Sequence, residues 1–138
     1  MANLVDRLLK ADVKKATELR TGTFKSQALA RVLGETEPVE IKIQEVSARK
    51  QTSIMDTALD DKGNVDLEKA YDANLKLIIA GVVEPSMKDE NLKEHFGCKM
   101  AIDLAELLFK NEASDIAEAI INLGKVGEVS DDAETIKN

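Results

Sequence analysis

The chain has 138 residues, 43% of them hydrophobic, which is enough for one domain with a single modest core. Its formal net charge of −7 is distributed unevenly, because residues 1–51 hold ten basic and seven acidic side chains whereas residues 52–138 hold nine and nineteen. Nucleic acid is therefore not expected as a partner, since acidic surfaces repel phosphates, although the N-terminal excess leaves room for a small basic patch.

Targeting and redox signals are sparse. The longest apolar run, LIIAGVV, is far shorter than the roughly 20 residues that cross a bilayer, and the N-terminus lacks the continuous apolar stretch of a secretory signal. Cys98 is the only cysteine, so there is neither an intrachain disulfide nor a CxxC pair for zinc. These features predict a soluble intracellular protein in a reducing compartment, with no membrane as a partner.

The first predicted helix begins after Asn3, whose side chain can cap it. Leu4, Val5, Leu8 and Leu9 then share one face at helical spacing. Two interpretations are open, namely packing of this face into the core or docking of the helix on a partner. We favour packing, because exposed apolar stripes are uncommon in monomers.

A β element is predicted next, over about residues 28–46. Val39, Ile41 and Ile43 alternate with polar residues after the turn-like segment GETEP, which is the period-two pattern of a strand with one buried face. Pro38 suits the entry to such a strand, where no ladder hydrogen bond is lost. A β-hairpin or small sheet accounts for this pattern.

Helical periodicity dominates the rest of the chain. Asp66 is a predicted N-cap, Glu84 is followed by the helix-breaking Pro85, and Gly97 suits the left-handed end of a short helix. Helices are predicted over about 47–59, 67–83, 89–96, 100–110 and 114–123. The fold class is therefore α+β and predominantly helical, with a small N-terminal β-hairpin or sheet packed with a C-terminal helical bundle. Residues 1–124 form a single domain, and the acidic segment 125–138 is predicted to be disordered.

The candidate metal-ligating and catalytic side chains lack the partner residues that such sites require. Asp60 starts a segment with the composition of a calcium loop, but Lys62 and Tyr71 occupy its third and twelfth positions, where acidic or amide ligands belong. His95 and Cys98 are three residues apart, yet no orienting group or oxyanion site marks a catalytic pair. We predict that the protein is not an enzyme and holds no metal or cofactor. A thiol-dependent enzyme, which would need an accessible and reactive Cys98, is a third and less favoured hypothesis.

The segment ANLKLIIAGVVEPSMKDENLKEHFG, with MAIDLAELLF and SDIAEAIINLGK after it, resembles the XkdN-like tail assembly chaperones of tailed phages and prophages. The similarity covers most of the chain and is strongest over residues 66–124. The positions that carry it, besides the apolar spacing, are Pro85, Asp89, Leu92, Phe96 and Gly97. The basic segment 11–25 has no evident place in the plan of that family.

The resemblance implies a non-enzymatic protein in the cytoplasm of the bacterial host. Such a protein binds the tape measure protein, keeps it soluble while tail tube subunits polymerise around it, and is absent from the mature particle. The family commonly also makes a longer product by ribosomal frameshifting, whose extension recruits the tail tube protein. The alternative is a structural tail or head-completion subunit that is retained in the phage particle. A homo-oligomer is compatible with either.

The proline corner supplies the candidate site. Pro85 and Gly97 are its structural residues, and there the chain turns so that short helices pack across the helix over 67–83. Either a groove opens between these helices, or the corner only ends a helix. A chaperone for a helical client needs such an apolar groove. The candidate contacts with the client, all large apolar side chains, are Leu4, Leu8, Leu9, Leu92 and Phe96.

Overall fold

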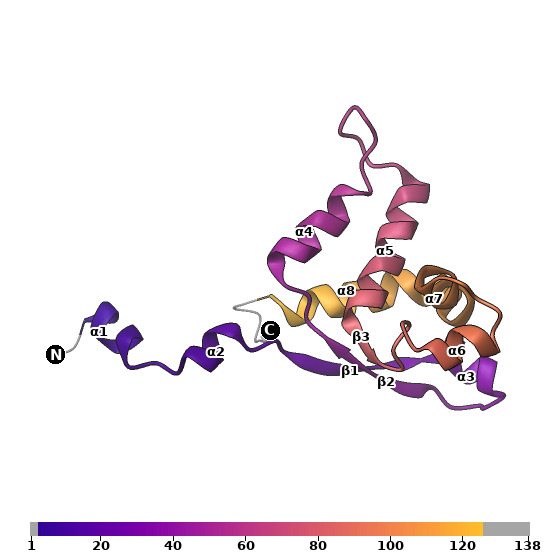
Figure 1. The fold of residues 1–138 in the computed structure, drawn as a ribbon, viewed down its shortest axis with the longest axis horizontal. Coiled ribbons are helices and arrows are strands. Elements are labelled where there is room, and N and C mark those ends of the chain that lie inside the picture. Colours follow the sequence, from indigo (N-terminus) through magenta and orange to yellow (C-terminus); the bar gives the residue numbers. More distant parts are fainter. Residues whose placement is uncertain (1–2, 126–138) are drawn as a thin grey trace, which may run out of the picture.

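The computed structural model describes residues 3–125, which form a mainly helical α+β body and an N-terminal arm, residues 3–19 (Figure 1). The fold class predicted from the sequence is confirmed. Apart from Lys125, the segment predicted to be disordered lies outside the described residues. The elements in chain order are α1 (Leu4–Leu9), α2 (Val13–Thr17), β1 (Thr21–Ser26), α3 (Gln27–Leu33), β2 (Val39–Gln44), α4 (Ala48–Asp56), α5 (Leu67–Gly81), β3 (Val82–Glu84), α6 (Glu90–His95), α7 (Ala101–Phe109), the 3₁₀-helix η1 (Lys110–Glu112) and α8 (Ala113–Leu123).

The three strands form one antiparallel sheet in the order β1-β2-β3. The alternation predicted for β2 is confirmed, since Ile41 and Ile43 are buried while Glu40 and Lys42 are exposed. β1 pairs with β2 along its full length, and β3 pairs with the end of β2 through a register shift. One face of the sheet is therefore apolar and covered by helices, and the other is polar.

The connection between β1 and β2 corrects the hairpin predicted over residues 28–46. Residues 27–33 form α3 instead, because Ala, Leu and Arg favour a helix and the Ser26 hydroxyl accepts a hydrogen bond from the Leu29 amide (3.0 Å) at its start. Gly34 ends α3 with a left-handed φ of 72°. The first strand of the sheet is thus the earlier segment 21–26, to which the sequence assigned no element.

The core lies between the sheet and the helices α5, α7 and α8. Asp66 caps α5 as predicted, since its carboxylate accepts hydrogen bonds from the amides of Glu68 (3.0 Å) and Lys69 (3.1 Å). At the other end of α5, a Cβ on Gly81 would lie 2.7 Å from the Ile120 side chain, so α5 and α8 approach closely there. The largest fully buried side chains of these three helices are Leu75, Leu77, Ile78, Leu104, Phe109, Ile116 and Ile120.

The N-terminal helix forms as predicted but does not pack on the core. Asn3 Oδ1 accepts a hydrogen bond from the Asp6 amide (2.8 Å), which caps α1. Leu4, Leu8 and Leu9 are nonetheless 63%, 64% and 80% exposed. Figure 1 shows the arm extending away from the body, with α2 between α1 and β1. The favoured expectation that this apolar face packs into the core is wrong.

Candidate partner-binding groove

A mainly apolar groove of about 440 Å³ opens beside Pro85, and we call it the Pro85 groove. One wall is α6, the opposite wall is α3, and residues of β2 and α7 lie between them. The lining residues are Leu29, Val32, Leu33, Val39, Glu40, Ile41, Glu84, Pro85, Leu92, His95, Phe96 and Leu108. The corner at Pro85 therefore accompanies a groove rather than a plain helix end.

The α6 wall is fixed by local signals at both of its ends. Asp89 Oδ1 accepts a hydrogen bond from the Leu92 amide (3.0 Å), and Gly97 follows the helix with a left-handed φ of 72°. Leu92 and Phe96 are one helical turn apart, which brings both side chains to the same face. The His95 ring meets the Phe96 ring edge-on, with centroids 4.9 Å apart. This wall presents a short apolar ridge.

The α3 wall is held in place by Glu112, which lies 84 or more residues further along the chain. Glu112 Oε1 accepts a hydrogen bond from the Ser26 hydroxyl (2.7 Å), and Oε2 accepts from the amides of Gln27 (2.6 Å) and Ala28 (3.2 Å). A carboxylate at this end of a helix satisfies free amides and opposes the positive end of the helix dipole. Glu112 therefore positions α3 relative to the C-terminal helices.

The structure brings together some of the predicted contacts and separates others. Leu92, Phe96 and Pro85 line the groove, and Gly97 lies just beyond α6. Leu4, Leu8 and Leu9 lie on the arm and line no part of it. The groove also differs in position from the one predicted, because α7 rather than α6 packs on α5, and α6 faces α3 and β2.

Sequence reasoning missed the whole α3 wall. Leu29, Val32 and Leu33 recur at i, i+3 and i+4, which is helical spacing, but the segment was assigned to a hairpin. Leu33 is 55% exposed although it borders the groove. The periodicity of ALARVL was the signal that could have identified this wall.

The rim of the Pro85 groove is acidic. Glu40 and Glu84 border it, and among the described residues 3–125 only Glu84 of the two has an ion pair, with Lys42 Nζ 3.5 Å from its Oε2. Both side chains of that pair are well exposed, so the pair contributes little to stability. An apolar floor with an acidic rim suits an amphipathic helix that carries basic residues beside its apolar stripe.

Comparison with known families decides the class of this protein. Residues 5–137 match the family described as "Phage XkdN-like tail assembly chaperone protein, TAC". The chain belongs to this family. The resemblance carried by residues 66–124 is thereby confirmed, and the match extends over nearly the whole chain. Searches of curated proteins and of solved structures gave no significant match.

The residues considered for chemistry have structural partners in this tail assembly chaperone. The Asp60 carboxylate accepts hydrogen bonds from the amides of Lys62 and Asn64, both at 2.9 Å, which closes the turn between α4 and α5. The Cys98 thiol lies 3.8 Å from the Phe96 carbonyl, as a weak donor to it. Within residues 3–125, no group of three or more His, Cys, Asp or Glu side chains is arranged to hold a metal ion. No helix in that range is both long and apolar enough to cross a membrane.

Proposed function

We propose that this chaperone binds the tape measure protein in the Pro85 groove, keeps it soluble and assists polymerisation of the tail tube around it. Family membership gives the general role, and the apolar groove between α3 and α6 supports the location. In this proposal the protein is not an enzyme. It acts in the cytoplasm of the bacterial host and is absent from the mature particle, and recruitment of the tail tube protein belongs to a longer, frameshifted product.

The groove suits one mode of peptide recognition. An amphipathic helix places side chains at i, i+3, i+4 and i+7 into an apolar groove, and an aggregation-prone helical client exposes stripes of this kind. Burying one Leu or Phe side chain contributes about 1.5–3 kcal/mol, so a few anchors offset the entropy lost on association. Leu92 and Phe96 on one wall and Leu33 on the other provide the surface for such anchors.

Co-expression with the tape measure protein tests the proposal. We expect the chain to raise the soluble fraction of the client, and Leu33→Lys to abolish that rise because it places a charge at the groove. Met100→Lys is the matched control, since Met100 is 62% exposed and does not line the groove. An equally insoluble client with and without the chain would refute the chaperone role, and full activity of Leu33→Lys would refute the location.

Mass spectrometry of purified particles separates the two functional classes. We expect the chain to be missing from finished tails, because a chaperone leaves its client during assembly. Its presence at the stoichiometry of a tail or head-completion protein would support the structural alternative instead.

A further inference from the structure

The N-terminal arm exposes an apolar stripe that the body of the chain does not cover. Every side chain from Asn3 to Arg20 is exposed, including those of Leu8 on α1 and Val13 on α2. A helix as short as α1, with six residues, is marginal in water on its own and depends on a packing surface for its stability. The arm therefore has the properties of a segment that docks on another surface.

A second exposed apolar surface lies at the far end of the α4–α5 hairpin, and we call residues 55–69 the tip surface. Val65 and Leu67 are 64% and 84% exposed, and Met55 and Leu59 are also exposed. A hollow of about 500 Å³, lined mainly by apolar atoms, opens among Met55, Leu59 and Val65. The tip surface thus provides a receptor for a few large aliphatic side chains.

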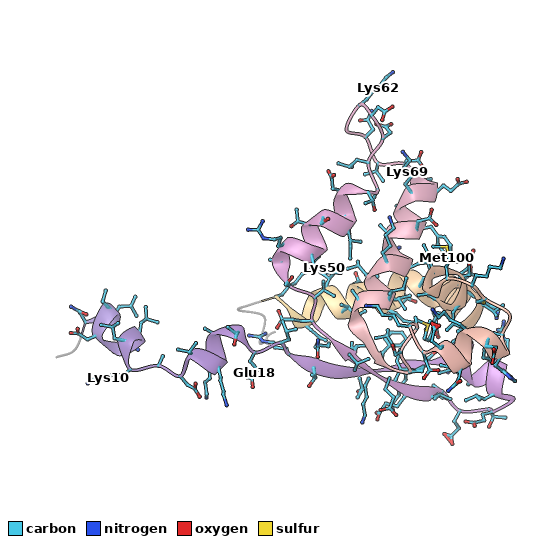
Figure 2. The ribbon with its side chains drawn as sticks, viewed as in Figure 1. Lys10, Glu18, Lys50, Lys62, Lys69 and Met100 are labelled. Carbon is cyan, nitrogen blue, oxygen red and sulfur yellow. The ribbon has the colours of Figure 1, made fainter. Side chains whose placement is uncertain are left out.

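The charges of the arm and the tip surface are complementary. The arm, residues 3–19, holds four basic and three acidic side chains, a net charge of +1, whereas residues 55–69 hold five acidic and two basic ones, a net charge of −3. Figure 2 shows Lys10 on the arm and Lys62 on the loop at the end of the α4–α5 hairpin, and the two residues are far apart. Opposite net charges favour an encounter between the two surfaces, and like charges would oppose it.

The arm leaves the body at a fixed point. The Arg20 amide donates to Glu45 Oε1 (2.8 Å), and the Arg20 guanidinium donates to the carbonyls of Leu123 (3.4 Å) and Lys125 (3.2 Å). From this anchor the arm and the α4–α5 hairpin extend in different directions (Figure 1). In this arrangement the arm of a chain does not cover the tip surface of the same chain.

We propose that the N-terminal arm of one copy docks on the tip surface of a second copy. The apolar residues of α1 and α2 enter the hollow beside Met55, and Lys14 and Lys15 face the acidic side chains around it. Two copies that exchange arms form a closed dimer, and one-way docking forms a longer row. One arm covers less than a standard interface, so the association is weak and depends on concentration. This inference does not depend on what binds in the Pro85 groove.

Light scattering on the full chain at rising concentration tests the proposal. We expect the molar mass to rise from that of the 15.1 kDa monomer to at least twice that value between about 5 and about 500 μM, the range in which small interfaces assemble. Lys14→Glu/Lys15→Glu on the arm and Asp56→Lys/Asp61→Lys on the tip surface should each hold the mass at the monomer value. Lys88→Glu/Lys99→Glu is the control for the arm variant, because it changes the net charge equally at exposed residues elsewhere.

A mixture of the two charge-reversed variants gives the decisive readout. Each variant retains the surface that the other has lost, so the mixture should recover at least half of the wild-type increase in mass. Circular dichroism should show the same thermal midpoint for both variants as for the wild type. The proposal is overturned by a monomer at every concentration, by association that persists in both variants, or by a mixture that stays monomeric. A monomer whose arm variant binds the tape measure protein less well would assign the arm to the client.

Discussion

Removal of the Glu112 carboxylate should loosen α3, one wall of the Pro85 groove. Three donors lose their acceptor, and they differ in burial, since Ser26 is fully buried and Gln27 is exposed. Water can replace the acceptor only at the exposed amide, whereas a buried donor left without a partner costs about 1–3 kcal/mol. With the smaller losses at the two amides, Glu112→Ala should lower the free energy of unfolding by about 2–3 kcal/mol. Glu112→Gln keeps one acceptor oxygen and should cost about 1 kcal/mol.

Urea denaturation of the full chain, followed by circular dichroism, measures these differences. Glu118→Ala is the matched control, because Glu118 is an exposed carboxylate on α8, and it should change stability by less than about 0.5 kcal/mol. Glu112→Ala should also bind the tape measure protein less tightly than Glu112→Gln, because α3 carries Leu29, Val32 and Leu33. Equal stability of the Glu112→Ala and Glu118→Ala chains would refute the role given to Glu112.

Three further predictions concern packing and ionisation. Gly81→Ala brings a methyl group to 2.7 Å from the Ile120 side chain and should lower the free energy of unfolding by about 1–3 kcal/mol, as measured by urea denaturation. Ile120→Val in the same chain should restore part of this loss. A Gly81→Ala chain more stable than the wild type would contradict the close packing of α5 and α8. Burial and the neighbouring Glu106 carboxylate raise the pKa of Tyr71 above 10.0. The contribution of Tyr71 to the stability of the folded chain is therefore complete below pH 10.0 and is lost as the pH rises through the raised pKa. Tyr71 is the only tyrosine, so ultraviolet titration reports it directly, and Glu106→Gln should bring the pKa closer to 10.0. Hydrogen bonds from the Asn64 and Lys62 amides lower the pKa of Asp60 below 3.8. The contribution of Asp60 to the stability of the folded chain is therefore present above pH 3.8 and is lost as the pH falls through the folded pKa. A carboxyl NMR titration that gives a pKa of 3.8 or more would show that these bonds are absent.

Helix ends were predictable because their signals are local. Four capping side chains each accept a hydrogen bond from an amide of the helix that follows, namely Asn3, Ser47, Asp66 and Asp89. The cap and the start of its helix lie within a few residues of each other, so a short stretch of sequence is enough to predict both. β3 carried no such signal. It has only three residues, and pairing with β2 rather than local propensity makes it a strand.

The groove was predictable only on the side that adjoins the proline corner. Leu92 lies in α6 and Phe96 directly follows it, and the cap and the end of this helix are both visible in the sequence. The α3 wall depends on contacts between Ser26 and Glu112, 86 residues apart, and no local pattern reports such a contact. The exposure of Leu4 was likewise beyond local reasoning, because an apolar stripe has the same sequence whether the body or another molecule covers it.

The link between Ser26 and Glu112 has a consequence for synthesis of the protein. During translation, α3 and then α6 leave the ribosome before Glu112, so until Glu112 emerges the growing chain lacks the carboxylate that anchors α3. Under the proposal that the Pro85 groove binds the client, the nascent chain completes its binding surface only after Glu112 has emerged.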